Sequence, residues 1–383
     1  MYKSINPGRI IVNLLKLIFV ISLLLGFIPG NSIYARAASY TISEANGTLL
    51  SCNGTEVFAD ADPATYVTTL KVNSPVLVTG VTSNGYWRVD IGGSPFYISQ
   101  QALSMQPNTT AYKLTSMDAK AALVMNLSNG KPLYSQGATD RLEPASTTKM
   151  MTALLTVEAI EAGQITLETP VMVSPTAIAD MPTDASHVSP RLQAGEVLNV
   201  DQLLTAMMVS SDCHSCNVLG ELVAGSVPNF VAMMNARAAQ LGCVDTNFTN
   251  PSGYPDKKMY TNANSLYLIT AEAIKHPTFN KYFGIKSAVL PATNLCIVPR
   301  ALINTDSLMD PSSIYYNPSV IGGKTGTANR AGQCLVTVAE KDGKKVISVV
   351  LGARNRTMID GNVISMRYFE TNRLLEHGFN NYW

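Results

Sequence analysis

The chain has 383 residues, of which 46% are hydrophobic and 14% are charged, and its formal net charge is +1. This length is sufficient for a large hydrophobic core and favours two domains. The charge balance is not basic enough to attract nucleic acid, which excludes a partner of that kind.

The first 37 residues have the features of a secretory signal peptide. Basic residues precede or interrupt an apolar run from Leu17 to Ile28, and small residues at Ala35 and Ala37 suit a signal peptidase. We therefore expect residues 1–37 to direct export, to the outer face of the cytoplasmic membrane or to the cell wall. An uncleaved membrane anchor is the alternative interpretation of the same segment.

Residues 38–106 predict a small antiparallel β-barrel. Their β-branched and aromatic residues gather in short runs that Gly, Ser and Asn punctuate. The predicted strands are 70–72, 75–80, 86–90 and 95–98. This succession resembles the bacterial SH3-like domains appended to cell-wall enzymes, and the resemblance implies a module that binds wall peptide. A spacer barrel without a ligand is the alternative.

Polar residues 107–117 are interpreted as a linker, and residues 118–383 as a second domain. Hairpin signals occur at Ser128-Asn129-Gly130 and at Asp342-Gly343, and helical patterns fill the region between them. The predicted helices include 200–209, 229–241 and a closing helix at 364–377. This order predicts an α+β domain whose first and last segments share one antiparallel sheet, covered by a helical cluster.

Ser146 and Lys149 stand at the start of an apolar run of good helix formers. Because they are three residues apart, their side chains share one helix face and the amine can reach the hydroxyl. The helix N-terminus adds unpaired N–H groups and a partial positive charge beside that hydroxyl. The pattern suits a serine nucleophile activated without histidine, although an N-capping serine before a surface lysine is the commoner meaning of such a pair.

Six cysteines are scattered along the chain, which is not the pattern of a small disulfide scaffold. Cys213 and Cys216 form a C-x-x-C pair. A zinc site would need a second pair of ligands, and haem attachment would need a histidine where Asn217 stands. We therefore expect no metal and no cofactor, and interpret the pair as small buried thiols on a helix. A redox or metal role is the alternative.

Two further motifs follow Ser146 and Lys149 in order. Ser211-Asp212-Cys213 comes directly after a Met-rich helix, and Lys324-Thr325-Gly326-Thr327 lies in a predicted strand. Together the three approximate the motifs of penicillin-binding proteins and class A β-lactamases. Each motif alone is weak, but three in order behind an export signal form a strong pattern.

The chain from about Ala121 to Trp383 resembles the serine D-alanyl-D-alanine carboxypeptidases, a group of low-molecular-mass penicillin-binding proteins. The resemblance implies a β-lactamase/transpeptidase-like fold. The string from Leu241 to Gly253 is typical of the carboxypeptidases. In this stretch we find no Glu-x-x-x-Asn loop of the kind that would indicate a β-lactamase.

The resemblance also implies a role for each motif residue. Ser146 would be the nucleophile, Lys149 its base with a pKa lowered by burial or by Lys324, and Ser211 would relay a proton to the departing D-alanine. The N–H groups of Ser146 and Thr327 would form the oxyanion hole. The residues expected at the substrate, chiefly at its terminal carboxylate, are Lys324, Thr325, Gly326, Thr327 and Arg356.

Cys213 departs from the family pattern, which usually has Asn at this position. A weakly bonding thiol therefore replaces the amide expected to hydrogen-bond the substrate. We expect the protein to remove the terminal D-Ala from peptidoglycan stem peptides through an acyl-enzyme, and β-lactams to trap Ser146. The alternatives are a wall-binding or penicillin-sensing protein without turnover, and a DD-transpeptidase in which an amine outcompetes water.

Overall fold

The computed structural model describes residues 40–51, 55–62, 65–70, 75–104, 117–179, 181–182, 185–357 and 363–382. The predicted signal peptide, most of the predicted linker and most of the strand expected at 70–72 lie outside these residues. The chain divides into two compact units, Met1–Lys113 with Arg356–Ile364, and Leu114–Asn355 with Ser365–Trp383. None of the helices in the described ranges is both long and apolar enough to cross a membrane.

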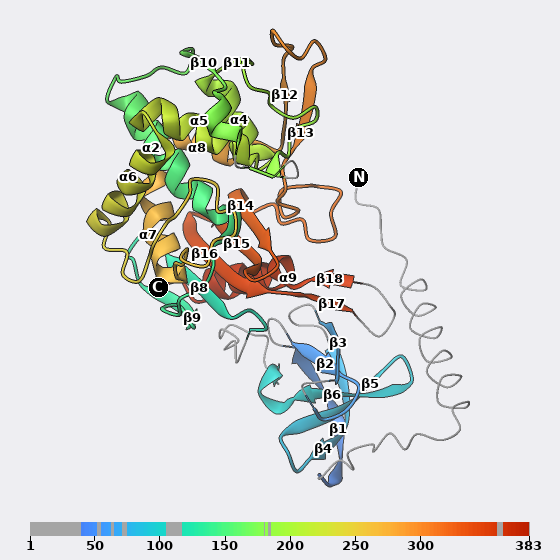
Figure 1. Cartoon of the computed structure of the whole chain (residues 1–383). Coiled ribbons are helices and arrows are strands. Elements are labelled where there is room, and N and C mark those ends of the chain that lie inside the picture. Colours follow the sequence, from blue (N-terminus) through green and yellow to red (C-terminus); the bar gives the residue numbers. More distant parts are fainter. Residues whose placement is uncertain are drawn as a thin grey trace, which may run out of the picture. The chain divides into compact units, whose positions relative to one another are not determined.

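The first unit contains a seven-stranded antiparallel sheet (Figure 1). Its strands are β1 (Ile42–Ser51), β2 (Glu56–Phe58), β3 (Tyr66–Thr69), β4 (Pro75–Thr82), β5 (Tyr86–Ile91), β6 (Ser94–Ser99) and β7 (Leu103–Ser104), in the spatial order β3-β2-β6-β5-β4-β1-β7. Buried residues such as Val78, Val89 and Ile98 form its core. The strands expected at 75–80, 86–90 and 95–98 are therefore present, while the SH3-like class of this unit stays a prediction.

The second unit is built on a five-stranded antiparallel sheet in the order β14-β15-β16-β8-β9. Its strands are β8 (Ala121–Asn126), β9 (Pro132–Gln136), β14 (Val320–Ala328), β15 (Gly332–Lys341) and β16 (Lys344–Ala353). The turn between β15 and β16 has positive φ at both central residues, Asp342 at 52° and Gly343 at 74°, as a type I′ turn requires. Because β8 pairs with β16, the prediction that the first and last segments share one sheet is confirmed.

Helices cover both faces of this sheet. They are α2 (Lys149–Glu161), α3 (Pro175–Ala179), α4 (Val200–Val209), α5 (Cys213–Ala224), α6 (Val227–Gln240), α7 (Ala263–Ala273), α8 (Pro277–Phe283) and α9 (Met366–Asn380). Successive side chains of β15 point to opposite faces of the sheet. Val336 and Val338 join the core of the helical cluster, whereas Leu335 packs with Tyr368 of α9. The expected α+β class is confirmed, with a helix on the second face as well.

Three short two-stranded sheets complete the described elements: β10 (Pro170–Met172) with β11 (Val197–Asn199), β12 (Ser287–Leu290) with β13 (Arg300–Ile303), and β17 (Asn355–Thr357) with β18 (Val363–Ser365). A wholly buried ion pair between Glu196 and Arg300 ties the β12–β13 hairpin to the segment before β11. Thr293, in the hairpin loop, donates to the same carboxylate over 2.7 Å. Glu196 thus holds in place the hairpin whose strand β13 borders the pocket described below.

Candidate active site

Ser146 lies in a 3₁₀ turn, Ala145–Thr148, that runs directly into α2. The residue before it, Ala145, has a positive φ of 47°, which is unusual for a residue other than glycine. Gly253 presses against this strained turn, since a Cβ there would lie 1.8 Å from the Ala145 carbonyl oxygen. Backbone strain held by tight packing is common at functional sites. The predicted helix start is confirmed, with the nucleophile candidate just ahead of the α-helix.

Lys149 is fully buried in the first turn of α2. Its Nζ donates to Ser146 Oγ over 2.9 Å, to the carbonyl of Ser252 over 2.7 Å and to Cys213 Sγ over 3.4 Å. These contacts exclude the alternative of a capping serine beside a surface lysine. They also place the amine against the hydroxyl it would activate.

Ser211 sits in the short connection between α4 and α5 with a φ of 64°. Asp212 follows as the N-cap of α5, accepting from the backbone N–H of Ser215 over 2.8 Å. Ser211 Oγ accepts a hydrogen bond of 2.9 Å from Nζ of Lys324, which is buried on β14. The second and third motifs therefore meet directly.

Strand β14 runs past the turn that carries Ser146. A Cβ on Gly326 would lie 2.9 Å from the backbone nitrogen of Ser146, so only glycine lets the strand come this close. The next residue, Thr327, accepts from Arg367 Nη1 over 2.8 Å. Thr325 is hydrogen-bonded to Thr305 through the two side-chain hydroxyls. This proximity of β14 to the Ser146 N–H agrees with the predicted oxyanion hole.

The two buried lysines influence each other's titration. Burial and the positive charge of Lys149 lower the pKa of Lys324 to about 7. Burial also acts to lower the pKa of Lys149, but the neighbouring Cys213, whose sulfur accepts from its Nζ, and the nearby Cys216 raise it on balance. The motif pattern predicts that Lys324 lowers the pKa of Lys149. In the structure it is instead the pKa of Lys324 that is lowered. Interacting amines titrate as a pair, so above about pH 7 the two hold one proton between them.

The C-x-x-C pair lies at the start of α5, and both thiols are free and buried, as expected from the sequence. Burial raises the pKa of Cys216. Cys213 Sγ contacts Lys149, and Cys213 is not among the residues that line the pocket. Its contact with the amine is a second role that the motif pattern does not indicate.

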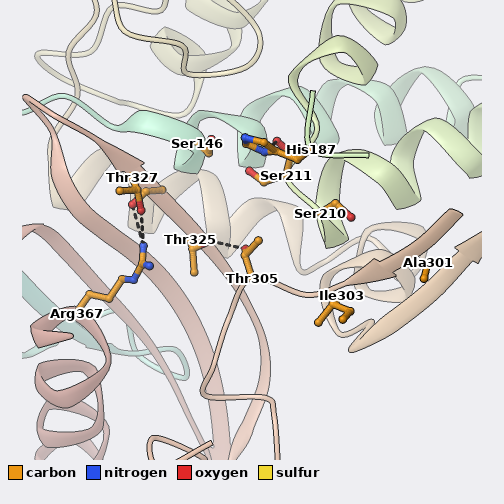
Figure 2. A pocket seen from close by; sticks show the side chains of 11 residues that line it. Ser146, His187, Ser210, Ser211, Ala301, Ile303, Thr305, Thr325, Thr327 and Arg367 are labelled. Atoms are coloured by element: carbon orange, nitrogen blue, oxygen red, sulfur yellow. Dashed lines mark hydrogen bonds between the residues drawn. The ribbon is translucent and has the colours of Figure 1, made fainter. Parts of the chain in front are cut away.

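An open pocket of about 550 Å³ lies over these groups (Figure 2). Its lining residues are Ser146, His187, Ser210, Ser211, Ala301, Ile303, Thr305, Thr325, Gly326, Thr327 and Arg367. The pocket thus combines one serine from each of the first two motifs with the polar end of β14. Strand β13 adds a more apolar wall through Ala301 and Ile303.

Arg367, which the sequence patterns do not single out, supplies the cation at this end of the pocket. It lies in the first turn of α9, and its Nη1 donates to the Gly326 carbonyl over 3.1 Å as well as to Thr327 (Figure 2). Arg356, the arginine expected there, belongs to β17, and its side chain is outside the described part of the structure. A role for Arg356 therefore stays a prediction.

Comparison with known proteins places this geometry in a family. The model of the D-alanyl-D-alanine carboxypeptidase family matches residues 106–355. The chain belongs to this family. It is 30% identical over 260 residues to D-alanyl-D-alanine carboxypeptidase DacF of Bacillus subtilis, a match that covers 68% of the chain and 64% of DacF. The chain thus spans less than two thirds of that relative's length.

Solved structures of the family show the same fold. The Streptomyces K15 DD-transpeptidase superposes with a TM-score of 0.60 at 26% identity, covering 70% of this chain and 99% of that one. Penicillin-binding protein D2 from Listeria monocytogenes, in its cefotaxime-bound form, has a TM-score of 0.58 at 26% identity, covering 70% and 100%. The resemblance drawn from the three motifs is confirmed, together with the penicillin-binding DD-peptidase fold of the second unit.

Proposed function

We propose that this protein is a serine D-alanyl-D-alanine carboxypeptidase that removes the terminal D-Ala from peptidoglycan stem peptides. The observation that carries the proposal is the 2.9 Å hydrogen bond from the wholly buried Lys149 to Ser146, at the floor of an open pocket. A buried amine touching a hydroxyl is how a serine nucleophile is activated in the absence of an adjacent histidine. Membership of the carboxypeptidase family supports the same reaction.

Acylation begins when Ser146 Oγ attacks the carbonyl carbon of the penultimate D-Ala and passes its proton to Lys149. Lys149 can accept this proton in the state in which Lys324 carries the single proton of the pair. The Ser146 and Thr327 N–H groups stabilise the oxyanion that forms. Ser211, which is hydrogen-bonded to Lys324, relays a proton to the departing D-alanine amine.

Recognition of the terminal carboxylate falls to the polar end of β14 with α9. Thr325 and Thr327 line the pocket with two hydroxyls, the buried Lys324 supplies a cation behind them, and Arg367 adds a guanidinium that suits a carboxylate geometrically. β-Lactams, which mimic the dipeptide and end in a carboxylate, should occupy the same groups and acylate Ser146.

Labelling with a fluorescent penicillin tests the nucleophile, with Ser146→Ala as the control. We expect covalent label on the native protein and none on the variant. Release of D-alanine from a peptide ending in D-Ala-D-Ala tests turnover. Equal labelling of both proteins, or label without D-alanine release, would contradict the proposed carboxypeptidase.

Transpeptidation is the second candidate function. The structural match to the Streptomyces K15 DD-transpeptidase, over 99% of that chain, supports it. An amine that reaches the acyl-enzyme before water would give a cross-linked product from the same site. Adding a glycine-type amine acceptor to the turnover assay separates the two, because transfer consumes the acyl-enzyme without forming the free acid.

Export and wall binding complete the proposal. The signal-like residues 1–37 support a location outside the cytoplasm, where peptidoglycan is found. The seven-stranded unit, through its SH3-like strand succession, would bind wall peptide. Sedimentation of this protein with purified peptidoglycan, compared with a version lacking residues 38–106, tests that role.

A further inference from the structure

His187 is a titratable pocket residue that the three-motif mechanism leaves without a role. It lies in the segment between α3 and β11, next to Ser186, and it is solvent-exposed at the rim of the pocket that contains Ser146. The backbone N–H of His187 and the hydroxyl of Ser186 both donate to Asp212 Oδ1 over 2.9 Å. These bonds hold the histidine over the connection that carries Ser211.

The ring contact of His187 determines its tautomer. Nδ1 lies 2.9 Å from the backbone carbonyl oxygen of Ser211, beside which the ring is drawn in Figure 2. A carbonyl oxygen can only accept, so Nδ1 must carry the hydrogen. In the neutral ring, Nε2 is then the unprotonated nitrogen, able to accept a proton.

The site also has a need for such an acceptor. Lys149 is the expected base for hydrolysis of the acyl-enzyme, but in the proposed acylation step it has already taken the Ser146 proton, and its Nζ donates to the Ser252 carbonyl and to Cys213 Sγ. The resolving water enters where the departing D-alanine amine has left, beside Ser211, and the Ser211 carbonyl is the group that orients His187. A neutral imidazole there can act where a charged amine cannot.

We propose that His187 Nε2 is the general base that takes a proton from the water resolving the acyl-enzyme. This inference rests on the proposed function, since it concerns the second half of the same reaction. The water O–H bond breaks as its oxygen bonds to the acyl carbon, and the proton moves to Nε2. The bond from that carbon to Ser146 Oγ then breaks, and Oγ takes a proton from the Lys149 ammonium, which already donates to it. His187 and Lys149 return to their starting states through proton exchange with solvent.

An imidazole can act as a base only in its neutral form. Burial lowers the pKa of the nearby His214, so that ring stays neutral. The rate of acyl-enzyme hydrolysis should therefore fall as the pH is lowered through the range in which an imidazole becomes charged, between about pH 8 and 5.

The test separates acylation from hydrolysis with a fluorescent penicillin. His187→Gln keeps an N–H donor for the Ser211 carbonyl but has no base. We expect its acylation rate to stay within about threefold of the native rate, while loss of label during a chase with unlabelled penicillin slows by at least about 100-fold and loses its pH dependence. Added imidazole should restore part of the rate in His187→Ala. His276→Gln is the matched control, since His276 pairs with Glu161 away from the pocket.

Loss of label from His187→Gln at the native rate, or with the native pH profile, would overturn the proposal. So would an equal fall in acylation and hydrolysis, which would indicate a structural role. Absence of label on the native protein would instead overturn the proposed function, and the role of His187 with it.

Discussion

Gly326 lies so close to the backbone of Ser146 that strand β14 can keep this position only while residue 326 has no side chain. The backbone nitrogen of Ser146 would lie 2.9 Å, and the carbonyl oxygen of Pro144 3.0 Å, from a Cβ at Gly326. A methyl group there must push β14 and the 3₁₀ turn apart, since both neighbours are backbone atoms. The oxyanion site between them would open by the same displacement.

Gly326→Ala should therefore lower the rate of acylation by penicillin by about 100-fold, the typical cost of misplacing reacting groups by about 1 Å. Gly163→Ala is the control for lost stability, because Gly163 has a φ of 71° but a Cβ there would meet nothing within 4 Å. It should lower the melting temperature and leave acylation unchanged. A native acylation rate in Gly326→Ala would show that β14 does not form the oxyanion site.

Cys213→Asn should increase kcat/KM for D-alanine release by about tenfold. The thiol is a weak acceptor for Lys149, whereas an amide oxygen accepts strongly and its N–H₂ can donate to the substrate, each bond being worth about 1 kcal/mol. Cys216→Ala is the matched control, because it removes a neighbouring buried sulfur that does not contact Lys149 through a hydrogen bond. An unchanged or lower kcat/KM in Cys213→Asn would mean that the active site of this protein works at least as well with a thiol at position 213 as with an amide.

Binding of D-alanine-terminated ligands should weaken as the pH rises through about 7. The pKa of Lys324 is lowered to about 7, so its positive charge is present below that pH and lost above it. In the Ser146→Ala background, which cannot turn over, the Kd should rise about tenfold between pH 6 and pH 8. Lys324→Arg, which stays charged throughout, should remove this dependence. If the Kd of the Ser146→Ala protein, which retains Lys324, does not change with pH, the charge of Lys324 does not contribute to carboxylate binding.

Arg367→Ala should lower kcat/KM by about 10- to 100-fold for a peptide with a free terminal carboxylate, since a charge-assisted hydrogen bond contributes about 1.5–3 kcal/mol. The same peptide with a terminal amide should be affected much less. Arg356→Ala is the companion variant, because the sequence pattern points to Arg356 and the structure brings Arg367 to the pocket. If Arg356→Ala, and not Arg367→Ala, discriminates between the peptides, the assignment moves to Arg356.

Glu196→Gln should destabilise the second unit by about 3–5 kcal/mol, because it leaves the fully buried Arg300 guanidinium without its carboxylate. Thermal unfolding measures the loss. Asp245→Asn breaks an ion pair with Arg141 in which both side chains are exposed, at 41% and 59%, and should have a much smaller effect because water screens the pair. Equal effects of the two substitutions would contradict a structural role for the buried pair.

Local patterns are sufficient to predict much of this molecule. The spacing of Ser146 and Lys149, the helix over 200–209 and the Asp342-Gly343 turn are all encoded within a few residues, and the structure has each of them. Contacts made across long stretches of chain cannot be predicted in this way. Arg367 reaches Thr327 from a helix 40 residues further along, and His187 reaches Ser211 over 24 residues.

The buried ion pair of Glu196 is another contact of this kind. Nothing in the sequence around Glu196 indicates that its carboxylate meets Arg300, 104 residues further along the chain. The direction of pKa coupling between Lys149 and Lys324 cannot be predicted from the sequence either, because it depends on how deeply each amine is buried and on which side the sulfurs lie.

The carbonyl of Ser252 holds the Lys149 amine over 2.7 Å through a main-chain atom, one that every residue type possesses. Alanine scanning at position 252 would therefore leave this carbonyl in place and report only on the Ser252 hydroxyl, which donates to Asn250 Oδ1 and accepts from the Tyr254 N–H. A drug-resistant variant could alter that carbonyl only indirectly, by reshaping the loop through residues such as Gly253 or Asn250, whose side-chain oxygen accepts from the backbone N–H groups of Ser252, Gly253 and Tyr254. Selection experiments under penicillin should accordingly find changes around this loop that carry no reactive group at all.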